Sequence, residues 1–207
     1  MTERQIRRRE DILAAARKLI TERGYEGVNM RDLAKESGVA PKTLYHQFGN
    51  KEKLLRAAVE ERFRYLYRLI DEEDIEHGID RIYFILDSVA DTTDKNLAYA
   101  RALAPLLRED ASSTFNAIRL NTYRKAIEQI ANEGEFVPWV DVSTLAMLVY
   151  RQVNPIYRSS HEYLDRKPWL IYAKLDISLI LAAVTTGYSH DKAIQVAQEM
   201  QQALKQV

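Results

Sequence analysis

The sequence predicts an all-α protein, and three observations support this fold class. Apolar residues recur at helical spacing, as in the series Ile12, Ala15, Ala16, Leu19 and Ile20. No stretch of the 207 residues shows the sustained alternation of apolar and polar residues that is typical of strands. Helix-capping residues and glycine stops divide the chain into segments of helical length. At 46% hydrophobic residues, the chain can also form a substantial core.

The first two helices are predicted from their ends. The periodic segment 7–23 is followed by Gly24, which stops the first helix. The second helix begins after Asn29, because an asparagine side chain can accept hydrogen bonds from the free N–H groups of a first turn. It ends at Gly38, which can adopt the left-handed conformation that a sharp turn requires.

The third and fourth helices follow closely. Pro41 opens a very short helix, where its missing N–H costs nothing, and this helix ends at Phe48. Asn50 caps a fourth helix, which continues to about Ile70.

The remaining segments are also predicted to be helical, with Pro105 and Pro155 kinking or ending two of them. A turn is expected at the segment GYSHD, residues 187–191. The expected helices are at about 78–91, 95–109, 112–132, 141–158, 169–187 and 191–205.

Composition excludes several classes of protein. The absence of cysteine excludes disulfides, cysteine zinc sites and thiol catalysis, and it suits a reducing cytoplasm. The charged N-terminus has no apolar segment of the kind found in a secretory signal. The longest apolar run, within residues 177–188, is too short to span a bilayer. We therefore expect a cytoplasmic protein.

The zero net charge conceals an asymmetry. Residues 1–58 hold 13 Lys and Arg against 8 Asp and Glu, whereas residues 59–207 hold 17 against 22. The first segment therefore carries +5 and the second −5. A basic head indicates an anionic partner, although chance clustering of charges on solvated helices explains the counts equally well.

The second and third helices match a helix-turn-helix, two short helices joined by a glycine-containing turn. A small core is expected from Leu33, Ala34, Val39, Leu44 and Phe48. The second of these helices also carries side chains that are not part of this core and can donate hydrogen bonds to phosphates or bases. They are Lys42, Thr43, Tyr45, His46 and Gln47. Lys51 begins the next helix, and the arm RQIRRR at 4–9 adds a flexible cationic extension. The alternative is an ordinary helical hairpin with surface lysines.

Residues about 8–58 closely resemble the N-terminal domain of the TetR family of bacterial transcriptional repressors. The resemblance rests on RREDILAAARKLITERGYEGVNMRDLAKESGVAPKTLYHQFGNKEKLL. Its specific parts are the aliphatic-alanine first helix, the G-Y-x-G turn, the xRDLAxxxGV second helix and the TLYxxFxNKEKLL end. The resemblance implies a homodimer that binds operator DNA, with the third helix in the major groove.

The same resemblance implies roles for individual residues. Arg31 matches a base-contacting position on the second helix, and the positions that read bases on the third helix are held by Pro41, Lys42, Thr43 and His46. Tyr45 and Lys51 match positions that hold the phosphate backbone. Ala40 departs from the family, in which many members have a serine or threonine cap there, but Pro41 still fixes the start of the helix.

Signals of catalysis or metal binding are scarce. HEYLD at 161–165 lacks the second histidine of HExxH, and DEED at 71–74 has no partner motif, so both are interpreted as solvated connections. The sequence has no glycine-rich phosphate loop and no nucleophile elbow. We therefore expect no enzymatic activity, no metal and no cofactor.

The larger C-terminal part contains aromatic and polar residues within helices that would otherwise be apolar. Such residues are typical of a ligand pocket with apolar walls and a few polar anchors. They are Tyr83, Tyr99, Phe115, Arg119, Tyr123, Tyr150, Arg151 and Asn154. The alternative is half-buried tyrosines and surface ion pairs. The resemblance implies an effector pocket here, with ligand binding moving the fourth helix. If Arg119 or Arg151 lines it, an anionic aromatic or fatty effector is expected.

The resemblance also places dimerisation on the helices 141–158 and 169–187. Leu179, Ala182, Ala183 and Thr186 would provide a largely small-residue surface for close helix contact, although packing within one chain is an equal alternative. A twofold dimer would bind a near-palindromic operator.

The expected organisation is a DNA-binding domain at 1–52 and an effector-binding and dimerisation domain at 53–207. The expected function is a ligand-responsive regulator, a repressor released from DNA by a small molecule. One alternative is an all-α small-molecule carrier or enzyme with an incidental basic N-terminus. Another is a nucleoid-type DNA binder without an effector, although the long C-terminal part argues against it.

Overall fold

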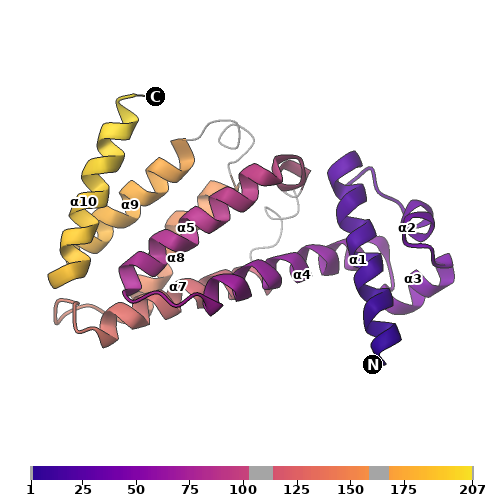
Figure 1. The fold of residues 1–207 in the computed structure, drawn as a ribbon, viewed down its shortest axis with the longest axis horizontal. Helices are drawn as coiled ribbons and strands as arrows, with labels where there is room; N and C mark the ends of the chain where they lie inside the picture. Colours follow the sequence, from indigo (N-terminus) through magenta and orange to yellow (C-terminus); the bar gives the residue numbers. More distant parts are fainter. Residues whose placement is uncertain (1, 103–113, 159–167, 207) are drawn as a thin grey trace. The chain divides into compact units, whose positions relative to one another are not determined.

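The computed structural model describes residues 2–102, 114–158 and 168–206, and its ribbon is shown in Figure 1. The regular structure of these residues is helical, with one isolated bridge between Phe136 and Thr185, so the all-α prediction is confirmed. The helices with described bounds are α1 (Glu3–Arg23), α2 (Met30–Ser37), α3 (Pro41–Phe48), α4 (Lys51–Glu72), α5 (Gly78–Lys95), α7 (Thr114–Asn132), α8 (Val142–Arg158), α9 (Pro168–Val184) and α10 (Gly187–Leu204).

The described residues form two compact units. The first holds residues 2–66 and 96–102, and the second holds residues 67–95, 114–158 and 168–206. Helix α4 begins in the first unit and ends in the second.

The helix ends of the first unit form as their sequence predicts. The Asn29 side chain accepts hydrogen bonds of 3.0 Å from the N–H groups of Arg31 and Asp32, which caps α2. Gly38 ends α2 at φ 66°, the left-handed region that glycine occupies without steric cost. Pro41 is the first residue of α3, and Ala40 before it provides no side-chain cap.

The core of the first unit joins α1 to the next three helices. Ile12, Ala16 and Ile20 are fully buried on α1, and Leu44 is fully buried on α3. Further buried side chains are Leu13, Leu19, Val28, Leu33, Ala34, Phe48, Leu54, Leu55, Ala58 and Val59. Burial of these side chains fixes α2 and α3 as a helix-turn-helix against α1 and α4.

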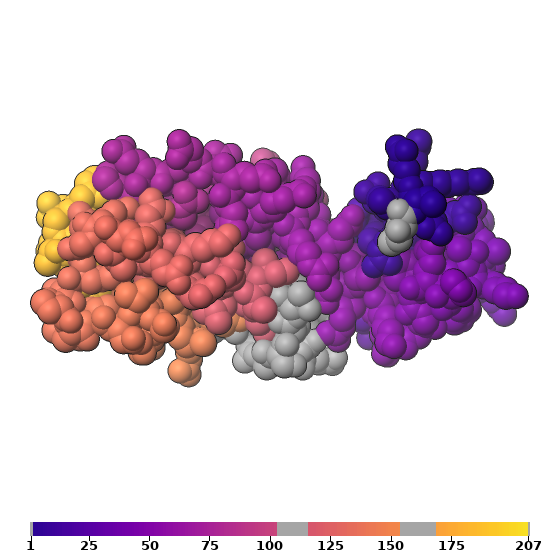
Figure 2. Space-filling model, turned by 90° about the horizontal axis from the view of Figure 1, so that it is seen from below, coloured from indigo at the N-terminus to yellow at the C-terminus, as the bar shows by residue number. Residues whose placement is uncertain are grey.

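The predicted flexible arm at residues 4–9 is wrong, because α1 already begins at Glu3. The N–H of Thr2 donates a 2.8 Å hydrogen bond to the Gln5 side chain, and the N–H of Ile6 bonds to the Thr2 carbonyl. Gln5 and the arginines of this segment are also good helix formers. The N-terminal residues, coloured indigo, stand out from the surface in Figure 2.

The second unit is a bundle of α5, α7, α8, α9 and α10. Its fully buried apolar residues include Ile79, Ile82, Ile85, Ala126, Ile127, Ile130, Val149, Ile177, Leu181 and Ala193. A 2.7 Å hydrogen bond between the hydroxyls of Tyr83 on α5 and Ser178 on α9 crosses this core. Pro155 does not end α8, which continues to Arg158, and Pro105 lies outside the described residues.

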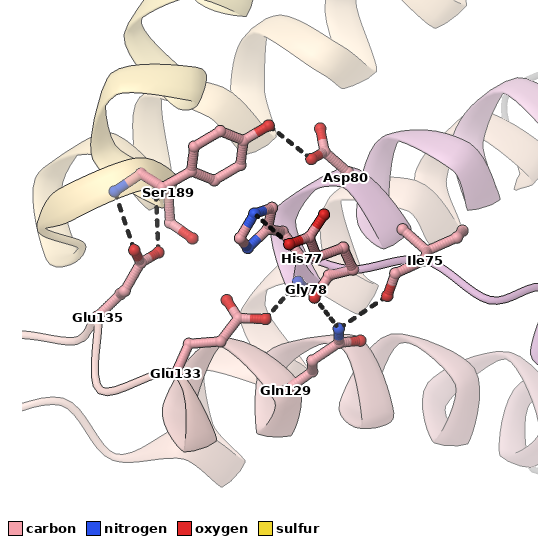
Figure 3. Close-up of polar contacts among 10 residues, drawn as sticks. Ile75, His77, Gly78, Asp80, Gln129, Glu133, Glu135 and Ser189 are labelled. Atoms are coloured by element: carbon pink, nitrogen blue, oxygen red, sulfur yellow. Dashed lines mark hydrogen bonds and ion pairs between the residues drawn. The ribbon is translucent and has the colours of Figure 1, made fainter.

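Helix α10 starts at Gly187, four residues earlier than predicted, so the segment GYSHD forms its first turn instead of an interhelical turn. The cause is Glu135, in the connection between α7 and α8. Its carboxylate accepts hydrogen bonds of 2.9 and 2.8 Å from the N–H groups of Tyr188 and Ser189 (Figure 3). A carboxylate at these free N–H groups stabilises the helix start.

The same end of the second unit holds α5 against α7. Gly78, the first residue of α5, donates its N–H to the Glu133 carboxylate at 2.9 Å (Figure 3). A Cβ at Gly78 would lie 2.5 Å from the Ala126 carbonyl oxygen, so only glycine allows this approach. The Gln129 amide donates to the carbonyls of Ile75 and Glu76, both at 3.0 Å. Within the described ranges, no helix is long and apolar enough to cross a membrane.

Candidate nucleic-acid interface

Helix α3 divides sharply into a buried side and an exposed side. Leu44 and Phe48 are buried in the core of the first unit, whereas Lys42 and His46 are exposed. Tyr45 is 53% exposed, so most of its ring and its hydroxyl face away from the core. Pro41 is exposed and Thr43 is partly exposed.

The exposed side chains of α3 have no partners in the described part of the chain. Neither Lys42, Thr43, Tyr45 nor His46 has a side-chain hydrogen bond or ion pair there. The same is true of Arg31, whose guanidinium lies exposed on α2 although its N–H binds Asn29. These groups keep their donors and charges for another molecule, and they are the groups that phosphates and base edges accept.

Lys51 behaves differently from the other predicted DNA contacts. Its ammonium lies 3.7 Å from a carboxylate oxygen of Glu26 and 5.9 Å from the centre of the Tyr25 ring. It is also 3.5 Å from the Glu26 carbonyl oxygen. The Glu26 side chain is largely exposed, so this ion pair contributes little free energy and a phosphate can compete for the ammonium.

Two exposed lysines of the first unit were not selected by sequence reasoning. Lys35 on α2 and Lys53 on α4 have no side-chain partner in the described residues. Lys53 follows Lys51 in the motif NKEKLL, and that spacing was the available signal.

The acidic segment DEED does not form a metal site in the described part of the chain. No group of three or more His, Asp or Glu residues is placed there to hold a metal ion. In DEED, Asp71 forms an ion pair with Lys125 of α7. The segment HEYLD lies outside the described residues.

The predicted effector residues are partly brought together. Arg119 is only 2% exposed, and its guanidinium lies 5.6 Å from the centre of the Tyr150 ring. Tyr123 is fully buried one turn after Arg119 on α7. Tyr83 is buried in the same unit, and burial raises the pKa of its phenol to about 12. A permanent cation with two tyrosines can orient an anionic ligand in an otherwise apolar interior.

Other members of that set lie elsewhere. Arg151 is exposed on α8. Tyr99 belongs to the first unit, where burial raises the pKa of its hydroxyl despite the charges of Arg17 and Arg62. The side chains of Phe115 and Asn154 lie outside the described residues.

The predicted dimer residues are mostly exposed. Leu179 is 50% exposed, and Ala183 and Thr186 are exposed on the following turns, whereas Ala182 is partly covered. Sequence reasoning missed Met147 and Leu148 on α8, which are each 43% exposed. Exposed aliphatic side chains on two helices are consistent with a protein contact surface.

A helix-turn-helix that presents unpaired donors and cations from its second helix defines a class, the DNA-binding regulators. The family described as "Bacterial regulatory proteins, tetR family" matches residues 12–58. The HTH-type transcriptional regulator UidR of Escherichia coli (strain K12) is 26% identical over 150 residues, which cover 68% of this chain and 75% of UidR.

Two solved structures share the fold. SmeT, the repressor of the Stenotrophomonas maltophilia multidrug efflux pump SmeDEF, has a TM-score of 0.67 at 16% identity over 87% of this chain and 92% of SmeT. SmeT is also solved in complex with triclosan. The regulator FadR from Bacillus subtilis, solved with stearoyl-CoA, has a TM-score of 0.66 at 19% identity over 83% of this chain and 96% of FadR. The resemblance of the N-terminal residues to the TetR family is therefore confirmed: residues 12–58 match the model of that family, and the similarity to UidR extends over 68% of the chain.

Proposed function

We propose that this protein is a cytoplasmic, ligand-responsive repressor that binds a near-palindromic operator as a homodimer. The observation that carries the proposal is the exposed side of α3, where four side chains able to bind DNA have no partner in the described residues. Exposure without partners costs the fold nothing and leaves each group available to a phosphate or a base edge.

The proposed contacts divide into two groups. Arg31, Lys42, Thr43 and His46, with Pro41 in close approach, face the base edges of the major groove. Tyr45 holds a phosphate through its exposed hydroxyl. Lys51 holds another after releasing Glu26, so its contribution is smaller than that of a free lysine.

A homodimer is supported by the exposed aliphatic residues of α8 and α9. In the dimer, Leu179, Ala183, Met147 and Leu148 of one protomer would pack against the same residues of its partner. Ala182 and Thr186 would lie at the border of this contact. Leu179→Glu should convert the dimer to a monomer, as measured by sedimentation velocity. A Leu179→Glu variant that remained dimeric would remove α9 from the interface.

The effector site is proposed around Arg119, Tyr123 and Tyr150, with Tyr83 in the same unit. The buried guanidinium favours an anionic aromatic or fatty effector, and the stearoyl-CoA complex of FadR and the triclosan complex of SmeT support a ligand in this fold. Because α4 contributes residues to both units, a ligand that shifts α4 would change the DNA-binding geometry. Such coupling must be reciprocal.

The effector proposal can be tested with defined probes. Salicylate and oleate, added separately, should lower DNA affinity if either fits the site. Arg119→Gln should remove that response without removing DNA binding itself. A response that persists in Arg119→Gln would contradict the role of Arg119.

The DNA proposal is tested by selection of duplexes from a random pool by the full-length protein. Enrichment of a palindromic sequence, with two similar half-sites about one helical turn apart, is the expected result. Recovery of unselective binding would support the nucleoid-type alternative, and recovery of no duplex would support a carrier or enzyme whose basic N-terminus has no DNA role.

A further inference from the structure

The arginines and lysines along α1 fall into two sets. In the second half of the helix, each cation is paired: Arg17 with Glu61, Lys18 with Glu36 and Arg23 with Asp32. In the first two turns, Arg4, Arg7 and Arg8 are exposed and have no ion pair or side-chain hydrogen bond in the described residues. The paired cations bind α1 to α2 and α4, so only the first set is available to another molecule.

The three unpaired arginines share one face of the helix. Residues separated by three and four positions are neighbours on a helix surface, so Arg7 and Arg8 both lie beside Arg4. Asp11 follows one turn later on this face, and it forms no ion pair with them in the described structure. Arg7 and Arg8 are therefore each held about one helical turn, 5.4 Å, from Arg4 on a regular helix.

These turns are attached to the helix-turn-helix. The guanidinium of Arg9 lies 4.7 Å from the centre of the Phe48 ring, and Phe48 is the last residue of α3. Ile12, one turn further, is fully buried in the core of the same unit. This cation–π contact and the core place the start of α1 beside the end of α3.

We propose that the first two turns of α1 form an additional DNA contact, in which Arg4, Arg7 and Arg8 bind phosphates adjoining the groove that α3 occupies. The proposal rests on the proposed function of α3. It extends the interface to residues before position 12, where the match to the family begins. Guanidinium groups suit this task because they bind phosphate oxygens in pairs and stay charged.

The test is the salt dependence of binding to the palindromic duplex selected by the wild-type protein. Each phosphate neutralised by a cation steepens the slope of log K against log salt by about 0.9. The triple variant Arg4→Gln, Arg7→Gln, Arg8→Gln should flatten the slope by about 2 to 5 for the dimer, which corresponds to one to three contacts per protomer. Glutamine keeps helix propensity and removes only the charge.

Two controls make the result specific. Arg68→Gln, Arg124→Gln, Lys205→Gln removes the same charge from exposed positions of the second unit and should leave the slope within about 0.5 of wild type. The triple variant Arg4→Lys, Arg7→Lys, Arg8→Lys should retain most of the slope of log K against log salt. Thermal melting should show the same Tm for the wild type and the α1 variants, because Arg4, Arg7 and Arg8 have no partners in the described fold.

The outcomes separate this proposal from the one on which it rests. If the wild type binds the selected duplex and the triple glutamine variant has an unchanged slope, the α1 contact is wrong and the role of α3 stands. An equal loss of slope in the second-unit control would also overturn the α1 contact, because net charge alone would then explain the effect. If the wild type binds no duplex with a salt-dependent affinity, the proposed function itself fails.

Discussion

Two polar regions of this molecule differ in where their hydrogen bonds go. At the start of α10, Glu135 binds two backbone N–H groups, and the hydroxyl of Tyr188 donates a 2.8 Å hydrogen bond to Asp80 of α5. On α3, by contrast, Lys42 and His46 have no side-chain partner in the described residues.

The difference separates structural polar groups from functional ones. Polar residues that bind other elements of the chain hold the second unit together, and their loss should lower stability without a direct effect on DNA. Loss of polar residues that the fold leaves unpaired should weaken DNA binding without lowering stability.

Leu44→Ala should have the largest effect, because Leu44 is the most deeply buried side chain of α3 and anchors the helix that carries the exposed side. The residue is fully buried, so the free energy of unfolding should fall by about 2–5 kcal/mol. Thermal melting followed by circular dichroism should show a lower Tm, and DNA binding should weaken with it. An unchanged Tm would show that α3 is not anchored by this side chain.

Arg31→Ala should weaken binding to the selected duplex by about 1–3 kcal/mol per half-site while leaving Tm unchanged. The variant protein should also discriminate less between bases at one position of the duplex, because a guanidinium that binds a base edge distinguishes one base from another. Lys51→Ala is the comparison, since it should weaken binding to all sequences evenly, and by less because Glu26 already pairs with it. Anisotropy titrations on single-base variants of the duplex would measure both. Equal changes in base preference would contradict the division of roles.

Glu135→Ala should lower the free energy of unfolding by about 1 kcal/mol, as expected for the loss of a helix cap. Burial pushes the pKa of Glu135 up, but hydrogen bonds from Ser189 and the N–H of Tyr188, together with the charge of His77, lower it overall. A lowered pKa means that the stabilisation is present above the ordinary glutamate pKa of about 4.3 and is lost as pH falls through the lowered value.

The difference in Tm between wild type and Glu135→Ala should therefore be full at neutral pH and shrink below about pH 4. Glu135→Gln is the control, because it keeps an acceptor oxygen and loses the charge. A difference in Tm that grew on acidification would contradict the capping role.

Tyr188→Phe should have the smallest effect, below about 1 kcal/mol, because the lost hydrogen bond to Asp80 lies at the surface. The phenyl ring retains the packing against His77, whose ring centre is 4.1 Å away. Asp80 raises the pKa of Tyr188 to about 12. The hydrogen bond therefore stabilises the fold below the ordinary tyrosine pKa and is lost as pH rises through about 12. Chemical denaturation at pH 8 should reveal the difference, and a loss as large as that of Glu135→Ala would show that the ring itself had moved.

Local signals predicted the first unit well. Asn29, Gly38 and Pro41 fixed the ends of α2 and α3 because caps, left-handed glycines and helix-starting prolines act within a few residues. The helical start of α1 was missed although its signal was local, since Thr2 and Gln5 form a capping pair.

The remaining differences required contacts that are distant in sequence. Glu135 starts α10 from 52 residues before Gly187, and Glu26 reaches Lys51 from 25 residues before it, so no local pattern predicts either. Helical periodicity also did not distinguish Arg119 from Arg151, although the first is buried and the second exposed. Which arginine faces the interior is decided by how the helices pack.

Tyr45→Ala would show whether the unpaired side of α3 binds DNA. Fluorescence anisotropy on the selected duplex at two salt concentrations would compare it with wild type and with Tyr65→Ala, a control on α4 whose side chain is similarly exposed. We predict salt-sensitive binding by wild type and Tyr65→Ala and a large loss of affinity in Tyr45→Ala, with the same Tm for wild type and Tyr45→Ala. Equal affinity of Tyr45→Ala and wild type would contradict this role of α3.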